Sequence, residues 1–171
     1  GSCGKTTLKE LLGKVLGKIS KASISQKSYN NKYGVPLSIL NLRQNDDFGI
    51  LEVGMDKKGE IDYLSKIIQP DVGVITNINY AHAKNFKNIN QIALAKAEII
   101  KNIKPNGFIV LNADDNFFKL HKKIALQNNI KVISFGVKNK KADIKFFKIK
   151  KLKKRYQIKI SFNNKKRNFL L

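Results

Sequence analysis

The chain has 171 residues, 42% of them hydrophobic, with 34 basic and 12 acidic side chains and a formal net charge of +22. This length fits one globular core, and a single cysteine excludes a disulfide framework or a cysteine-cluster metal site and fits the reducing cytoplasm. No apolar run is long enough to cross a bilayer, so no membrane partner is expected.

The chain opens on a phosphate-binding motif that leads into a helix. The run Gly1-Ser2-Cys3-Gly4-Lys5-Thr6-Thr7 lets backbone N–H groups converge on phosphate oxygens at a helix start. In such a loop, Lys5 reaches the β- and γ-phosphates and the Thr6 hydroxyl ligates Mg²⁺. A buried strand normally precedes the motif, so we expect the chain to be a fragment that lacks this strand.

Helices and strands alternate as far as Gly136. Apolar residues at helical spacing predict helices over 5–20, 59–68, 90–103 and 115–127. Short apolar runs predict buried strands over 48–53, 71–76, 107–111 and 130–135, and residues 23–32 are polar. This alternation indicates an α/β fold of the P-loop type, a mostly parallel sheet with helices on both faces.

After Gly136 the pattern becomes that of antiparallel strands. Residues 142–149 and 156–162 alternate apolar and polar side chains, Asn163-Asn164 suits a turn, and a short apolar run follows at Phe169. We interpret the basic run 150–155 as a solvated hairpin connection. The prediction is one domain over 1–171, with an α/β core over 1–136 and appended antiparallel strands over 137–171.

Polar side chains follow the predicted parallel strands, where α/β sheets bind ligands. Glu52 ends the strand over 48–53, and its carboxylate suits Mg²⁺ held against phosphates, with capping of the next helix as the alternative. His82 follows the next strand, and is either a ligand or a plain loop residue. His121 lies on a lysine-rich helix and is predicted to be on the surface.

Lys96 shares a helix face with isoleucines. Ile92, Ile99 and Ile103 form an apolar stripe at helical spacing, and Lys96 falls on it. A lysine on an inward face must be neutralised or paired. The alternative is that its stem follows the apolar surface and its ammonium reaches water.

The combined pattern resembles the Mur ligases, the ATP-dependent amino-acid-adding enzymes of peptidoglycan synthesis, and within them the branch that adds D-alanyl-D-alanine. Nearly the whole chain takes part in the resemblance. The stretches that carry it are 1–7, Asn30-Asn31-Lys32-Tyr33-Gly34-Val35-Pro36-Leu37, Glu52-Val53-Gly54-Met55 through Gly59-Glu60-Ile61, 70–82, Ala95-Lys96-Ala97-Glu98-Ile99 and Leu111-Asn112-Ala113-Asp114-Asp115.

The resemblance implies a role for each candidate residue. Thr6 and Glu52 would hold the Mg²⁺ that bridges the β- and γ-phosphates, and His82 would hold a second Mg²⁺. Lys96 would be carbamylated by CO₂, which turns a cation into an anionic, metal-facing group. Lys5, His82 and Lys96 would be catalytic, and Asn30 and Asn31 would lie near the substrate. ATP would be held by Gly1, Ser2, Cys3, Gly4, Lys5, Thr6 and Thr7.

The resemblance also implies a two-step reaction. The terminal carboxylate of UDP-MurNAc-tripeptide would attack the γ-phosphate of ATP, and the amine of D-alanyl-D-alanine would displace phosphate from the resulting acyl phosphate. The enzyme would be a cytoplasmic monomer. Its UDP-binding and C-terminal domains would lie outside this chain, which we therefore expect to be inactive alone. A ligase that adds the third residue, or one like folylpolyglutamate synthetase, is the alternative.

The positive charge also raises nucleic-acid binding, since Lys and Arg neutralise phosphates. The only arginines are Arg43, Arg155 and Arg167, whereas lysines are spread along the chain together with frequent Asn and Ile. Arginine dominates base readout and bidentate phosphate contacts. We therefore predict no nucleic-acid partner, and keep a non-enzymatic nucleotide- or nucleic-acid-binding P-loop domain as a distant alternative.

Overall fold

The computed structural model describes residues 4–80, 85–152, 155–162 and 165–170. The described part contains no helix that combines the length and the apolar character needed to cross a membrane. In chain order, the elements are α1 (Lys5–Leu16), β1 (Ala22–Ile24), α2 (Gly34–Leu40), β2 (Phe48–Ile50), α3 (Glu60–Ile68), β3 (Val72–Ile75), α4 (Ile89–Ala97), the 3₁₀ helix η2 (Glu98–Asn102), β4 (Phe108–Asn112), α5 (Phe118–Gln127), β5 (Lys131–Gly136), β6 (Ile144–Leu152), β7 (Arg155–Phe162) and β8 (Lys165–Leu170).

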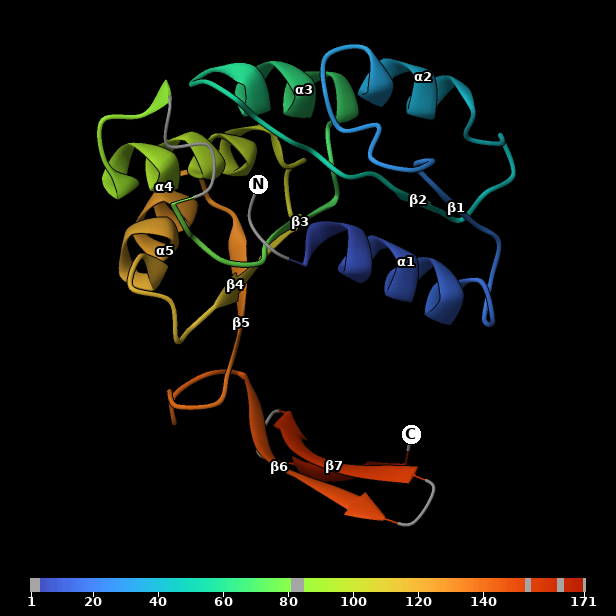
Figure 1. Cartoon of the computed structure of the whole chain (residues 1–171), viewed down its shortest axis with the longest axis vertical. Helices are drawn as coiled ribbons and strands as arrows, with labels where there is room; N and C mark the ends of the chain where they lie inside the picture. Colours follow the sequence, from blue (N-terminus) through green and yellow to red (C-terminus); the bar gives the residue numbers. More distant parts are fainter. Residues whose placement is uncertain (1–3, 81–84, 153–154, 163–164, 171) are drawn as a thin grey trace.

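The strands form two sheets (Figure 1). β1 and β2 pair in parallel, and the second sheet has the order β3-β4-β5-β6-β7-β8. Strands β3 to β6 run parallel. β7 runs antiparallel to both of its neighbours, β6 and β8, and these three strands extend away from the helices in Figure 1. The predicted α/β class, with parallel strands first and antiparallel strands near the C-terminus, is confirmed.

The core lies where helices cover the parallel strands. In β4, Ile109 and Leu111 are fully buried and alternate with half-buried neighbours, the pattern of a strand with one face on the core. Ile92 of α4, Ile100 of η2 and Ala125 of α5 join them in one cluster. Figure 1 shows α4 and α5 on one side of β3–β5 and α1 on the other, so the parallel strands are flanked on both faces as predicted.

One strand was not predicted, and three local predictions differ from the structure in part. The polar stretch 23–32 overlaps β1, whose three residues are too few to form a sequence pattern and are held by pairing with β2. The first helix ends at Leu16, next to Gly17, a residue that disfavours helix. β2 is not buried, since Phe48 is 38% exposed at the edge of a two-stranded sheet. In the basic run 150–155, residues 150–152 and Arg155 belong to paired strands.

The surface position predicted for His121 was also wrong. Its side chain is 2% exposed, and its Nε2 lies 3.0 Å from the carbonyl oxygen of Ala93. Burial in this apolar setting lowers the pKa of the imidazole. Phe118, His121 and Ala125 share one helix face, and this spacing was the signal that the neighbouring lysines obscured.

Asp114 fastens the segment after β5 to the end of β4. Its carboxylate accepts hydrogen bonds from the backbone N–H groups of Val137, Lys138 and Asn139, at 2.6, 3.0 and 2.7 Å. These bonds, that of Lys138 first and then those of Val137 and Asn139, lower the pKa of the Asp114 carboxyl because they favour its charged form. The carboxylate thus holds the chain where it turns from the parallel to the antiparallel strands.

We expect Asp114→Asn to lower the midpoint of thermal unfolding at neutral pH, with a difference that disappears in acid. The folded-state pKa is below the unfolded value of about 3.9. The stabilisation is therefore complete above the unfolded pKa and is lost as pH falls through the folded pKa. Thermal unfolding across pH tests this, with Asp71→Asn as control because that side chain is 77% exposed. A pH-independent difference would contradict the assignment.

Candidate functional site

A cavity of about 620 Å³ lies between β2 and β3 and brings the main candidate residues together. Lys5 of α1, Glu52 after β2 and Lys96 of α4 all line it. Apolar side chains of α1, among them Leu8, Leu12 and Leu16, and residues of β3 form much of the remaining wall. Three charged groups from distant parts of the chain thus share one largely apolar cavity.

Glu52 is the centre of this site. Its side chain is only 4% exposed, and its Oε2 accepts a hydrogen bond of 2.7 Å from the Thr6 hydroxyl. The Lys5 Nζ lies 3.9 Å from Oε1 of the same carboxylate. The predicted alternative, a carboxylate capping the next helix, is not what the structure shows, because the Glu52 oxygens face the start of α1.

Asn30 holds the other side of the Glu52 carboxylate. Its Nδ2 donates to Glu52 Oε1 at 2.9 Å, and its carbonyl oxygen accepts from the Gly54 N–H at 2.7 Å. A Cβ atom on Gly54 would lie 2.9 Å from the Asn30 side chain, so glycine is required for this close approach. The Asn30 predicted near a substrate therefore also orients the candidate metal ligand.

The start of α1 suits an anion. Gly4 has φ of 89°, a left-handed conformation that glycine adopts without steric penalty, and no side chain in the described part caps the helix. The first N–H groups of a helix lack intrahelical partners and carry the positive end of its dipole. Together with Lys5, they give this helix start the donors and positive charge that suit phosphate oxygens, beside the Thr6 hydroxyl and Glu52.

Lys96 lies on the apolar face that the sequence predicted. Ile92 and Ile103 are buried, Ile99 is half-buried, and the half-buried Lys96 lines the cavity. Its Nζ donates a hydrogen bond of 3.1 Å to the carbonyl oxygen of Asn77, in the segment after β3. The Lys96 ammonium is thus directed to the same strand ends that carry the other candidates.

The remaining predicted residues lie elsewhere. Asn31 Oδ1 accepts from the N–H groups of Tyr33 and Gly34, at 3.1 and 2.9 Å, and so supports the start of α2. Thr7 is exposed on α1. Gly1, Ser2, Cys3 and His82 lie outside the described residues. Among the residues that the structure does describe, no group of three or more His, Cys, Asp or Glu could hold a metal.

Two residues near the site were missed from the sequence. Asp115 accepts from the N–H of Ile78 at 3.0 Å and so ties the segment after β3 to the end of β4. Lys9 of α1, which the sequence did not single out, is 2% exposed. Its spacing from Leu12 and Leu16, which line the cavity, was the available signal.

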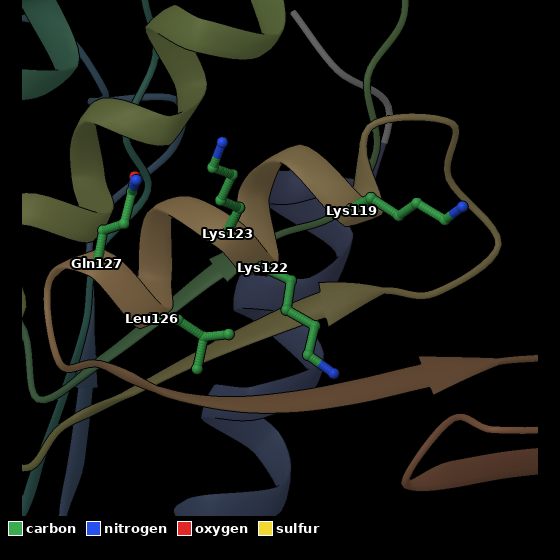
Figure 2. A pocket seen from close by; sticks show the side chains of 5 residues that line it. All are labelled: Lys119, Lys122, Lys123, Leu126 and Gln127. Carbon is green, nitrogen blue, oxygen red and sulfur yellow. The ribbon is translucent and has the colours of Figure 1, made fainter.

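A second hollow, of about 520 Å³, lies on α5 and is lined by Lys119, Lys122, Lys123, Leu126 and Gln127. Figure 2 shows the three lysines pointing in different directions, so their ammonium groups do not converge on one anion. The Lys122 Nζ lies 5.9 Å from the centre of the Phe118 ring on the same helix. The chemistry is therefore assigned to the cavity between β2 and β3.

Comparison with known proteins is consistent with this geometry. The family model of the Mur ligase middle domain matches residues 1–170. The UDP-N-acetylmuramoyl-tripeptide–D-alanyl-D-alanine ligase of Buchnera aphidicola (subsp. Acyrthosiphon pisum) is 40% identical over 141 residues, which are 82% of this chain and 30% of that protein.

Solved structures agree. A crystal structure of MurF from Acinetobacter baumannii matches with a TM-score of 0.89 and 33% identity, over 100% of this chain and 37% of that chain. The MurF ligase from Thermotoga maritima in complex with ADP matches with a TM-score of 0.87 and 29% identity, over 99% of this chain and 38% of that chain. The chain thus spans about a third of the length of these relatives.

Proposed function

Because the chain belongs to the Mur ligase family, whose middle domain it matches, we propose that it is the ATP-binding part of a ligase that joins D-alanyl-D-alanine to UDP-MurNAc-tripeptide. The observation that carries the proposal is the hydrogen bond of 2.7 Å between the Thr6 hydroxyl and Glu52, which lines a cavity together with Lys5 and Lys96. A hydroxyl and a carboxylate beside a helix start are oxygen donors suited to Mg²⁺ and phosphate.

Each residue has a defined role in this proposal. Lys5 and the backbone of residues 1–7 hold the phosphates of ATP. Thr6 and Glu52 hold one Mg²⁺, and His82 holds a second. These ions neutralise charge where a carboxylate approaches a polyanion. Asn30 orients Glu52, and Asn30 and Asn31 lie toward the substrate side.

The proposed reaction proceeds in two steps. The substrate carboxylate oxygen bonds to the γ-phosphorus as the bond to the β-phosphate oxygen breaks, which gives an acyl phosphate and ADP. The amine of D-alanyl-D-alanine then attacks the acyl carbon, phosphate leaves, and the amine proton is lost to solvent. Lys5 stabilises the negative charge of the transferred phosphoryl group.

We further propose that the Lys96 amine reacts with CO₂ to form a carbamate, with release of one proton. This reaction replaces a cation by an anion that can face Mg²⁺. The proposal is supported by the position of Lys96 in the wall that also holds Glu52, on a helix face otherwise made of isoleucines. A half-buried ammonium in such a wall would repel a Mg²⁺ ion held nearby, whereas a carbamate would attract it.

For the organisation of the chain, we propose a central domain with an α/β core over 1–136 and antiparallel strands over 137–171, flanked in the whole enzyme by a UDP-binding and a C-terminal domain. The separation of β2 from β3 by the apolar cavity supports a further strand of the enzyme lying there. Neighbouring strands of one sheet lie about 4.8 Å apart. β2 and β3, which this cavity separates, belong to different sheets. A monomer without nucleic-acid partners remains our prediction.

The test is ADP release by the full-length enzyme that contains this chain. With ATP, Mg²⁺ and UDP-MurNAc-tripeptide, we expect ADP formation to depend on D-alanyl-D-alanine and to be lost in Lys5→Ala. Release that depends instead on a diamino acid, with the shorter UDP-MurNAc-dipeptide as acceptor, would contradict the proposal and favour the ligase that adds the third residue. Release that depends on a folate and glutamate would favour the folylpolyglutamate synthetase type.

A further inference from the structure

Lys9 is a buried cation that the proposed reaction does not use. It lies on α1, one turn after Lys5, and is 2% exposed. Its Nζ donates to the carbonyl oxygens of Ser25 and Lys27, each at 2.6 Å, and lies 3.4 Å from the Glu10 carboxylate, which is 48% exposed. Burial of an ammonium is unfavourable unless it is paired and hydrogen-bonded, so these contacts define its role.

The carbonyl groups that Lys9 binds belong to segment 25–30. This segment also makes hydrogen bonds to Glu52. Ser25 Oγ accepts a hydrogen bond from the Glu52 N–H at 3.3 Å. At the other end of the segment, Asn30 Nδ2 donates to the Glu52 carboxylate at 2.9 Å. Segment 25–30 therefore lies between α1, which carries Thr6, and the strand end that carries Glu52.

The backbone of this segment is held in an unfavourable conformation. Lys27 has φ of 45°, in the left-handed region that residues with a side chain seldom adopt. Such a conformation persists when surrounding contacts stabilise it. The bond from the Lys9 ammonium to the Lys27 carbonyl oxygen is a contact of this kind, because a charged donor strengthens the hydrogen bond.

We propose that Lys9 is a positioning residue for the metal–nucleotide site. Its ammonium fixes segment 25–30 against α1, and the segment in turn fixes Glu52, so that the Glu52 carboxylate stays opposite Thr6 before Mg²⁺ arrives. This inference rests on the proposed function, since it assumes that Thr6 and Glu52 bind Mg²⁺ with a nucleotide. Lys9 itself acts through segment 25–30, whose Ser25 carbonyl oxygen it binds, and contacts neither the nucleotide nor Mg²⁺.

The experiment measures ADP binding by calorimetry, with and without Mg²⁺, for the wild-type full-length enzyme and for its Lys9→Met variant. We expect Lys9→Met to reduce the gain in ADP affinity due to Mg²⁺ by about tenfold, the effect of losing hydrogen bonds to a charged group. Lys14→Met is the matched control, because it removes the same charge from an exposed position on the same helix. It should leave the gain unchanged.

Two results would overturn the inference. If Lys9→Met weakens ADP binding by the same factor with and without Mg²⁺, Lys9 acts only through its positive charge. If it lowers only the midpoint of thermal unfolding, Lys9 is structural. Should Lys9→Met not fold, Ser25→Ala tests the same contacts, because it removes the acceptor of the Glu52 N–H. If Mg²⁺ then raises ADP affinity as much as in wild type, the positioning role of Lys9 is rejected.

Hydrogen exchange separates this inference from the proposed function. In Lys9→Met, or in Ser25→Ala if the first variant does not fold, the amide protons of Glu52 and Gly54 should exchange faster than in wild type. Those of β4 and β5 should not change. If wild type binds no ADP, the proposed function fails while the exchange data still report on positioning. Unchanged exchange at Glu52 and Gly54 would reject the positioning role.

Discussion

Glu52→Gln should remove the gain in ADP affinity that Mg²⁺ provides and lower the ligation rate of the full-length enzyme by about 100- to 1000-fold. A neutral amide is a poor Mg²⁺ ligand compared with a carboxylate. It also places an N–H₂ group where Glu52 now accepts hydrogen bonds from Thr6 and Asn30. Lys5, which is 3.9 Å from the carboxylate, would lose the charge that faces it.

The same substitution should leave thermal stability unchanged or slightly higher. Glutamine keeps the shape of Glu52 without a buried charge, and the Lys5 side chain that loses its partner is 24% exposed and can be solvated. Loss of Mg²⁺-dependent binding without loss of stability would therefore mark Glu52 as a functional residue. Calorimetric titration of ADP with and without Mg²⁺, together with thermal unfolding, measures both quantities.

Glu60→Gln is the control with the opposite expectation. Glu60 Oε2 accepts hydrogen bonds from the N–H groups of Asp56 and Lys57, at 2.6 and 3.1 Å, just before α3. The bond from Asp56 is the main reason that the pKa of the Glu60 carboxyl is lowered. We expect this variant to unfold at a lower temperature at neutral pH and to keep its response to Mg²⁺. The reverse pattern in the two variants would contradict the assignment of Glu52.

Lys96→Ala should reduce ligation by the full-length enzyme by about 1000-fold or more, since it removes a group proposed to face a metal. If the active group is a carbamate, a short carboxylate such as acetate or propionate should enter the space left by the side chain and restore part of the activity. Removal of bicarbonate should slow the wild-type enzyme, and its return should restore the rate.

Two measurements distinguish a carbamate from an ordinary ammonium. Wild type exposed to ¹³C-labelled bicarbonate should show a carbamate carbon signal by NMR, and Lys96→Ala should lack it. Lys101→Ala is the matched control, since Lys101 lies one turn further along on η2 and is exposed. Full activity of Lys96→Ala would remove Lys96 from the mechanism, and a partly active variant that no carboxylate rescues would leave Lys96 acting as a cation.

The elements with strong local patterns were predicted well, and those without them were not. The strand of residues 107–111 was recognisable because Phe108-Ile109-Val110-Leu111 is a short continuous apolar run. β1 escaped prediction because three residues carry no period, and its pairing with β2 is a long-range contact. His121 was misplaced because three lysines surround it in sequence, although the helix turns them to another face.

By itself, the sequence determined the α/β class, the alternation of most helices and strands, and the candidate phosphate-binding motif that leads into α1. These features depend on local periodicity and on one contiguous motif, and both are present in the chain before it folds. It also placed Lys96 on an apolar helix face, since that inference needs only the helical period.

Only the tertiary structure decided which distant side chains meet. Thr6 and Glu52 are 46 residues apart and become hydrogen-bonded partners because α1 packs against β1 and β2. Lys9 is buried against carbonyl groups that segment 25–30 brings to it, whereas Lys14 on the same helix is exposed. Such contacts depend on how loops pack between elements, and no local pattern encodes that packing.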